Sequence, residues 1–139
     1  EFFKFFTSLY KNNVIYTKEL DKKSIEKKEK KKKVFSFIHD NYFKDISRKD
    51  IIDTLDIGEA QFTRFFKEVS GATFTEYLNS YRIIKSAYLL IYTKKSITDI
   101  AYETGFQDLS YYIKIFNKQM GVSPNNYRKN IATQTLKNL

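Results

Sequence analysis

The sequence predicts an all-α fold, in which two helix-turn-helix subdomains are joined by a long linker helix, with about seven helices and an N-terminal helical extension. Three observations predict it. Apolar and aromatic residues recur at intervals of three and four, the period of an amphipathic helix. With 4 glycines and 1 proline in 139 residues, the chain has little turn chemistry for a many-stranded sheet. A two-helix segment also occurs twice, which indicates a duplicated unit.

The duplication is clearest in the second helix of each unit, where residues 61–67 (QFTRFFK) align with residues 111–117 (YYIKIFN). Pairs of similar residues match at one constant offset: Phe62 with Tyr112, Arg64 with Lys114, Phe66 with Phe116, Gly71 with Gly121, and Tyr77 with Tyr127. The first helices include residues 50–57 and 99–106. They align at an offset one residue smaller than the second helices do, because the second turn carries an extra residue. A repeated two-helix unit requires a repeated target, and duplex DNA offers one in its successive major grooves.

The chain divides at about Lys33. Residues 1–33 hold a short apolar stripe followed by a lysine-rich stretch, and we expect an N-terminal helical segment and a linker. So short an apolar helix is unstable alone, so the stripe needs a partner surface. Three alternatives remain open: the end of an upstream domain, a dimer helix, or a segment packed back on the rest of the chain. The chain begins at Glu1 without methionine, which suggests a fragment of a longer protein. The stripe comprises Phe2, Phe3, Phe5, Phe6, Leu9 and Tyr10.

Residues 34–73 are the expected first subdomain, within a domain that spans 34–130. Ser47 is a good N-cap for its second helix, and Asp56 in the turn tolerates a left-handed backbone. The third helix begins at Gly58 or a neighbour, runs through Ser70 and is closed by Gly71. The expected inward residues are Val34, Phe35, Ile38, Tyr42 and Phe43 on the first helix, Ile51, Ile52 and Leu55 on the second, and Phe62, Phe65 or Phe66, and Val69 on the third.

Residues 74–92 form the expected linker helix, which at 1.5 Å per residue is about 27 Å long and separates the two halves. Its apolar residues are available to both flanking subdomains: Tyr77, Leu78, Tyr81, Ile84, Leu89 and Ile91.

Residues 93–130 form the expected second subdomain, and residues 131–139 a C-terminal tail. Ser96 caps the fifth helix, Gly105 turns the chain, and the sixth helix runs from about Asp108 to Met120 and ends at Gly121. A last short helix is primed by Ser123 and Pro124. The inward residues are Ile97, Ile100, Ala101, Tyr112, Ile115, Phe116, Met120 and Tyr127.

The composition disfavours an enzyme. No cysteine is present and His39 is the one histidine, so we expect no catalytic residue, no metal site and no cofactor, and we interpret His39 as an ordinary helix residue. There is no phosphate loop and no nucleophile with a base. No apolar run approaches the roughly 18 residues that span a bilayer, so we expect no membrane association and a cytoplasmic protein.

The net charge of +9 is unevenly distributed. Residues 1–33 carry +6, residues 34–130 carry +2 and the tail carries +1, so the repeated region is nearly neutral. Eight lysines fall between Lys22 and Lys33. Such a run is most often a solvated face or a flexible linker, and the alternative is a contact with DNA phosphates that is independent of sequence.

Residues 96–128 read SITDIAYETGFQDLSYYIKIFNKQMGVSPNNYR. This segment resembles the C-terminal signature of the AraC/XylS family of bacterial transcription regulators, and the likeness extends from about Val34 to Lys129. The resemblance implies a sequence-specific double-stranded DNA-binding protein that places two recognition helices in adjacent major-groove segments on one face of the DNA. Family members usually carry an N-terminal ligand-sensing or dimerising domain, so the expected partners are DNA, a second copy bound through that domain, and RNA polymerase.

A recognition helix buries one stripe and offers the opposite stripe to base edges. Arg64 can pair with guanine O6 and N7, and Gln61 with adenine. Ala60 and Thr63 can touch a thymine methyl group. The outward set on the sixth helix is less polar, so we expect more thymine contacts there: Leu109, Ser110, Tyr111, Ile113 and Lys114.

Taken singly, an outward residue is best interpreted as part of a solvated face, with Arg64 in a weak ion pair with Glu68. The matched cations Arg64 and Lys114 favour DNA instead, because they occupy equivalent positions of a duplicated unit. Phosphate contacts are expected from Lys67, Lys118 and Arg128, and from the helix N-termini around Ser47 and Ser96.

Four departures from the family pattern predict weak binding by this module alone, at an A·T-rich site: Asp56 in the first turn, Gly58 as N-cap, Glu59 with Ala60 at the start of the first recognition helix, and Ile113 on an exposed stripe. We expect dimerisation to add affinity. The competing hypothesis is a helical protein-interaction module that docks Leu109, Tyr111 and Ile113 on the transcription machinery.

Overall fold

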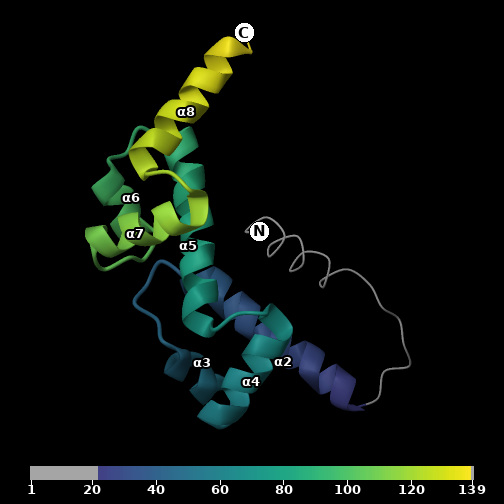
Figure 1. The fold of residues 1–139 in the computed structure, drawn as a ribbon. Coiled ribbons are helices and arrows are strands. Elements are labelled where there is room, and N and C mark those ends of the chain that lie inside the picture. The colour runs from purple at the N-terminus through teal and green to yellow at the C-terminus, as the bar shows by residue number, and fades with distance from the viewer. Residues whose placement is uncertain (1–21, 139) are drawn as a thin grey trace. The chain divides into compact units, whose positions relative to one another are not determined.

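The structure, a computed structural model, describes residues 22–138, which form seven helices and no strand (Figure 1). The all-α prediction is therefore confirmed. Within this range, no helix is both long and apolar enough to cross a bilayer. The helices are α2 (Lys22–Asn41), α3 (Arg48–Leu55), α4 (Glu59–Ser70), α5 (Phe74–Tyr92), α6 (Ile97–Glu103), α7 (Leu109–Met120) and α8 (Pro124–Lys137).

The helices belong to two compact units. The first contains α2 up to Asp40, then α3, α4 and the start of α5 up to Tyr77. Its core is a cluster of aromatic rings, in which Phe66 lies 5.6 Å from Phe62, 5.7 Å from Phe74 and 5.6 Å from Tyr77 between ring centroids. Aromatic pairs at this spacing add to the stabilisation from buried area. Phe62 and Phe66 are each 1% exposed, so their assignment to the core is confirmed.

The second unit contains residues 41–46 and α5 from Leu78 onward, with α6, α7 and α8. Its core comprises eight buried residues: Ile83, Ala87, Leu90, Ile100, Ala101, Phe106, Tyr112 and Phe116. Partly buried residues pack against this core, among them Ile97 and Tyr127. Burial of Tyr112 and Phe116 confirms the prediction for the second copy of the repeat.

Local signals set the helix ends. Asp56 has φ 53°, in the left-handed region, and its N–H donates to the carbonyl of Ile52 at the end of α3. Gly71 and Gly121, each with φ 76°, end α4 and α7 in the same way. Ser96 and Ser123 accept hydrogen bonds from the backbone N–H groups of Asp99 and Asn126. These capping residues are the ones that the sequence predicts.

The first and last helices differ from the prediction. α2 begins at Lys22 and continues through Lys33, so the described part of the lysine-rich stretch is helical rather than a flexible linker. α8 is not short, because it runs on to Lys137 through the predicted tail. The division into domains stays a prediction, and the expected apolar stripe in residues 1–33 lies outside the described residues.

Two side chains that the sequence places inward are exposed. Phe43 is 47% exposed because α2 ends at Asn41 and the chain there has left the helical register. Ile91 is 39% exposed, and Leu90 fills the core in its place.

Candidate nucleic-acid interface

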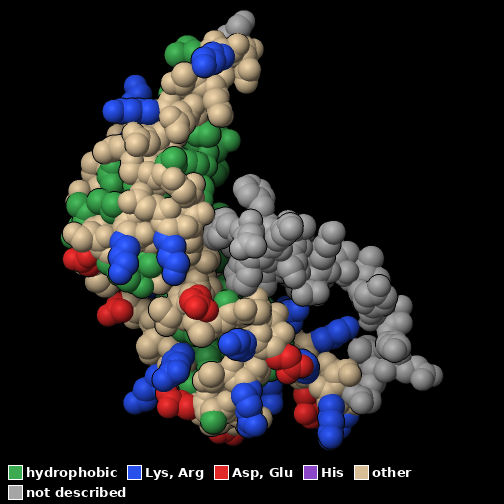
Figure 2. Space-filling model, viewed as in Figure 1, with side chains coloured by type: hydrophobic (Ala, Val, Ile, Leu, Met, Phe, Trp, Pro, Cys, Tyr) green, Lys and Arg blue, Asp and Glu red, His purple; other side chains and the backbone are tan. Residues whose placement is uncertain are grey.

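The helices α4 and α7 are structural equivalents, each of 12 residues and each ended by a left-handed glycine. Each buries an aromatic pair: Phe62 with Phe66 on α4, and Tyr112 with Phe116 on α7. The remaining sides of these helices are therefore the ones available to a ligand. Lys and Arg side chains lie on the surface around α4 and α7 in the view of Figure 2, interspersed with acidic ones.

The candidate base-reading residues of α4 are all on the surface. Ala60, Gln61, Thr63 and Arg64 are exposed, as is the candidate phosphate ligand Lys67 in the last turn. The Thr63 hydroxyl donates to the carbonyl of Glu59 at 2.9 Å. That hydrogen bond occupies the hydroxyl proton, which leaves the methyl group and an acceptor for a ligand.

An acidic residue at the start of α4 is offset by a neighbour. The carboxylate of Glu59 lies 3.3 Å from Nε of Arg48, which belongs to the first turn of α3. Glu59 stabilises the helix N-terminus but repels a phosphate backbone. The guanidinium of Arg48 lowers that repulsion, although the pair is exposed and contributes little to stability.

The ion pair expected between Arg64 and Glu68 is not the one that forms. Glu68 instead pairs with Lys27 of α2, across a sequence separation that no local pattern predicts. Among the described residues, Arg64 and Lys114 have no ion pair or side-chain hydrogen bond. Both cations are therefore free for an anionic or acceptor-rich ligand.

The candidate residues of α7 divide into two sets. Ser110, Tyr111 and Lys114 are exposed, whereas Leu109 and Ile113 are partly buried and pack against the core of the second unit. The sequence pattern places Ile113 on an exposed stripe, but the structure partly buries it. The buried face of α7 includes Leu109 and Ile113 as well as the pair Tyr112 and Phe116.

The ring of Tyr111 is held in place from two sides. Its hydroxyl accepts a hydrogen bond at 2.9 Å from Nδ2 of Asn79, a buried residue of α5. Its ring centroid lies 6.2 Å from that of Phe106. A side chain that is 42% exposed and fixed at its polar end presents a preorganised apolar edge.

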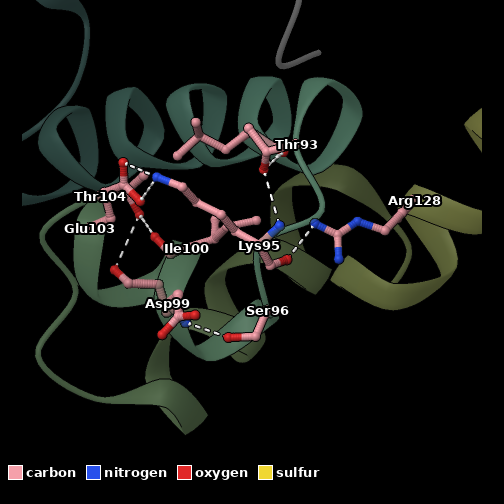
Figure 3. A network of polar contacts seen from close by, with 10 residues as sticks. Thr93, Lys95, Ser96, Asp99, Ile100, Glu103, Thr104 and Arg128 are labelled. Carbon is pink, nitrogen blue, oxygen red and sulfur yellow. Dashed lines mark hydrogen bonds and ion pairs between the residues drawn. The ribbon is translucent and has the colours of Figure 1, made fainter.

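The candidate phosphate ligands at helix N-termini make local hydrogen bonds. The backbone N–H and hydroxyl of Ser47 both donate to Oδ2 of Asp50, at 2.7 and 2.9 Å, and these bonds hold the pKa of Asp50 below its usual value. Ser96 caps α6 through Asp99 (Figure 3). On the last turn of α7, Lys118 is exposed.

Arg128 has structural partners that no sequence pattern indicates. Its Nε donates to the carbonyl of Leu90 at 3.1 Å and its Nη2 to the carbonyl of Lys95 at 2.8 Å. Figure 3 shows the guanidinium facing Lys95, whose own ammonium pairs with Glu103 at 2.6 Å. The role of Arg128 in phosphate binding stays a prediction. Its Nε and Nη2 already donate to carbonyls, so fewer of its N–H groups are available to a phosphate.

Comparisons with known proteins identify the fold. A family described as a helix-turn-helix domain matches residues 51–130. The uncharacterized HTH-type transcriptional regulator YdeC of Bacillus subtilis is 30% identical over 125 residues, which is 88% of this chain and 43% of that protein. The chain therefore spans less than half the length of that relative.

Solved structures agree with this assignment. The C-terminal domain of the two-component response regulator yesN from Fusobacterium nucleatum has a TM-score of 0.67 and 28% identity, and covers 70% of this chain and 96% of its own. The DNA-binding domain of the global transcriptional factor AdpA shares the fold, with a TM-score of 0.71 and 19% identity over 76% of this chain and 94% of its own. Together with the signature in residues 96–128, these matches show that the chain belongs to the AraC/XylS family of transcription regulators.

Proposed function

We propose that this chain binds double-stranded DNA sequence-specifically and regulates transcription, with α4 and α7 inserted into adjacent major-groove segments. The observation that carries the proposal is the equivalence of α4 and α7, which present unpaired cations, Arg64 and Lys114, at matched positions. Membership of the family and the fold shared with a domain solved on its target DNA support it.

On α4, Arg64 donates to O6 and N7 of a guanine, and Gln61 pairs with an adenine. Ala60 and the methyl group of Thr63 contact thymine. Ala60 and Thr63 are exposed near the start of α4, the part of a recognition helix that approaches base edges.

On α7, Lys114 and Ser110 supply the polar contacts, and the fixed edge of Tyr111 supplies an apolar contact with a thymine methyl. Leu109 and Ile113 contribute only the parts of their side chains that the core leaves uncovered. This balance favours an A·T-rich site.

Phosphate contacts come from Lys67 and Lys118, and from the N-terminal turns of α3 and α6 around Ser47 and Ser96, with Arg128 as a further ligand. Such contacts position the module without reading sequence. We further propose that a domain outside this chain dimerises the protein and raises its affinity, that RNA polymerase is a partner, and that the protein acts in the cytoplasm.

The test begins with selection of bound duplexes from a random pool, followed by fluorescence anisotropy on the selected site. Arg64→Ala and Lys114→Ala should each weaken binding to that site by about 1–3 kcal/mol and relax the preference at one base pair. The matched control is Lys67→Ala, which should weaken binding to all duplexes alike.

The opposite result has a clear meaning. If the double variant Arg64→Ala, Lys114→Ala keeps the same base preference, these residues do not read bases. If the chain shows neither base preference nor a salt-dependent affinity for DNA, it is a protein-interaction module instead.

A further inference from the structure

A groove runs between the second half of α5 and the outer part of α8, both in the second unit. It has a volume of about 590 Å³, and its walls include Leu90 and Ile91 on α5 and Ile131, Ala132 and Leu136 on α8. Leu136 is 73% exposed and Ile91 is 39% exposed. Large apolar side chains grouped at a surface mark an interaction site more often than a solvated face.

An aromatic pair extends the apolar surface along α5. Tyr88 and Tyr92 are 60% and 69% exposed, and their ring centroids are 4.6 Å apart. Positions three and four apart share one side of a helix, so Tyr88 lies on the same side of α5 as Ile91 and as Tyr92. Hydrophobic side chains are visible at the surface beside α5 in Figure 2.

The last turns of α8 lack a covering layer. Residues 132–138 are all exposed, although α8 is helical as far as Lys137 (Figure 1). Two helical turns without tertiary packing have little stability of their own in water. A partner that covers Leu136 and Ile131 would supply the apolar contacts that hold this part of the helix.

The charged residues that line the groove are both basic. Lys94 and Arg128 line it, and Lys129 and Lys137 lie on the same helix as Arg128. The two stretches that build the walls, residues 77–98 and 109–139, contain no aspartate or glutamate. The bonds from Arg128 to the carbonyls of Leu90 and Lys95 fix one of these positive charges at the groove. An apolar groove with basic neighbours complements a ligand that is apolar on one side and acidic on the other.

We propose that this groove docks an acidic amphipathic helix of a partner protein. The apolar residues of that helix, spaced i, i+3, i+4 and i+7, contact Ile91, Ile131 and Leu136, and its carboxylates meet Lys94 and the exposed end of Arg128. The groove lining includes none of the base-reading residues of α4 and α7, so partner docking and base reading use different side chains. Arg128 is the one residue proposed both for this partner and for DNA phosphates.

The test uses the whole chain and three labelled 18-residue peptides. The first carries Leu and Phe at i, i+3, i+4 and i+7 with Glu at most other positions, the second replaces each Glu by Lys, and the third is a scramble of the first. Fluorescence anisotropy should show saturable binding of the first peptide only. Leu136→Asp, Ile91→Asp and Lys94→Glu, which change residues of the groove lining, should each weaken it by about tenfold. The matched control is Tyr102→Asp on α6, which is exposed and does not line the groove, and which should change the affinity less than about twofold.

Four results would overturn the proposal. The first is that the acidic peptide shows no saturable binding up to about 1 mM. The second is that the basic or scrambled peptide binds as tightly as the acidic one. The third is that the groove variants bind the acidic peptide as tightly as the wild-type chain does, and the fourth is that Tyr102→Asp weakens binding as much as the groove variants do. Self-association of the chain in sedimentation equilibrium that Leu136→Asp abolishes would assign the groove to a second copy. Binding to phosphatidylglycerol vesicles that Leu136→Asp abolishes would assign it to a lipid surface. Leu136, Ile91 and Lys94 are exposed, so we expect these variants to fold, and circular dichroism checks this.

Discussion

Two guanidinium groups hold the segments that lead into α3 and α6. Arg82, which is 8% exposed, donates from Nε to the carbonyl of Tyr42 at 2.7 Å and from Nη2 to the carbonyl of Lys44 at 2.8 Å. Arg128 makes a similar pair of bonds, one to the carbonyl of Leu90 within α5 and one to that of Lys95 just before α6. Burial lowers the pKa of Arg82, and Asp45 and Tyr111 partly offset that effect. The planar fork of arginine suits two carbonyls at once, which a lysine cannot match.

Replacing Arg82 tests this role. Arg82→Lys keeps the charge but loses the fork, so at least one of the two carbonyls, of Tyr42 and Lys44, loses its donor. We expect the free energy of unfolding in urea to fall by about 1–3 kcal/mol. The exposed Lys67→Arg is the matched control and should change it by less than about 0.5 kcal/mol. An equal effect of the two variants would show that the two bonds contribute nothing to stability.

Gly105 is the second position where one residue type is required. Its φ is 96°, and a Cβ there would lie 2.2 Å from the carbonyl oxygen of Tyr42 and 2.8 Å from Nε of Arg82. Gly105→Ala should therefore lower the free energy of unfolding by roughly 2–4 kcal/mol, since it adds strain and displaces the Arg82 bond. The control, Gly58→Ala, places its Cβ in open space. If calorimetry gives both variants the same midpoint, the close approach at Gly105 is not a constraint.

At the scale of elements, the sequence predicts the helices whose ends are set locally. Ser96, Ser123, Gly71 and Gly121 act within one turn of their own positions, so α6, α8, α4 and α7 begin or end where these residues indicate. The first helix, expected from Val34, begins at Lys22 in the structure, because a run of lysines indicates a solvated face or a linker and gives no sign of which. Glutamates four residues before lysines, as in Glu26 with Lys30, support a helix there and could have indicated it.

The N-terminus of α3 depends on a charged carboxylate. Asp50 accepts from both donors of Ser47, and its pKa lies below the usual value mainly because of the backbone bond. A depressed pKa in the folded state means that the stabilisation is fully present above the unfolded pKa, about 4, and is lost as the pH falls through the folded value.

Asp50→Asn should therefore destabilise the protein at pH 7 and matter less at low pH. The measurement is the difference in unfolding midpoint between the two proteins at pH 7, 5, 4 and 3. We expect a difference that is constant from pH 7 to 5 and shrinks below pH about 4. Asp53→Asn, on the same helix, is the control. A difference that stays constant down to pH 3 would show that the carboxylate charge has no part in the cap.

At the scale of the whole molecule, the helical period predicted which residues of α4 and α7 face outward, but it could not predict their partners. The pairs Lys27 with Glu68, and Asn79 with Tyr111, join residues 41 and 32 positions apart. Such pairs depend on how the helices pack, and the same is true of the carbonyls that bind Arg128. The partial burial of Leu109 and Ile113 has the same origin, because core width is a property of the assembled unit.

The lysines of α2 form a basic surface whose role charge counting alone does not assign. The lysines of α2 account for much of the net charge of +9, and partial burial together with the neighbouring Lys27 lowers the pKa of Lys31. This crowding of like charges favours a bound polyanion. Lys28 and Lys32 are exposed and lie four residues apart on one side of α2.

If these lysines neutralise DNA phosphates, the double variant Lys28→Gln, Lys32→Gln should lower the slope of log affinity against log salt by about 1.8, at roughly 0.9 per phosphate. The base preference should not change, because phosphate contacts carry no sequence information. The control is Lys137→Gln at the end of α8, which should leave the slope alone. Anisotropy titrations between about 50 and 200 mM salt measure all three proteins. An unchanged slope in the double variant would make the α2 lysines a solvated face. The phosphate contacts would then come only from the ligands proposed above, which are Lys67, Lys118, Arg128 and the N-terminal turns of α3 and α6.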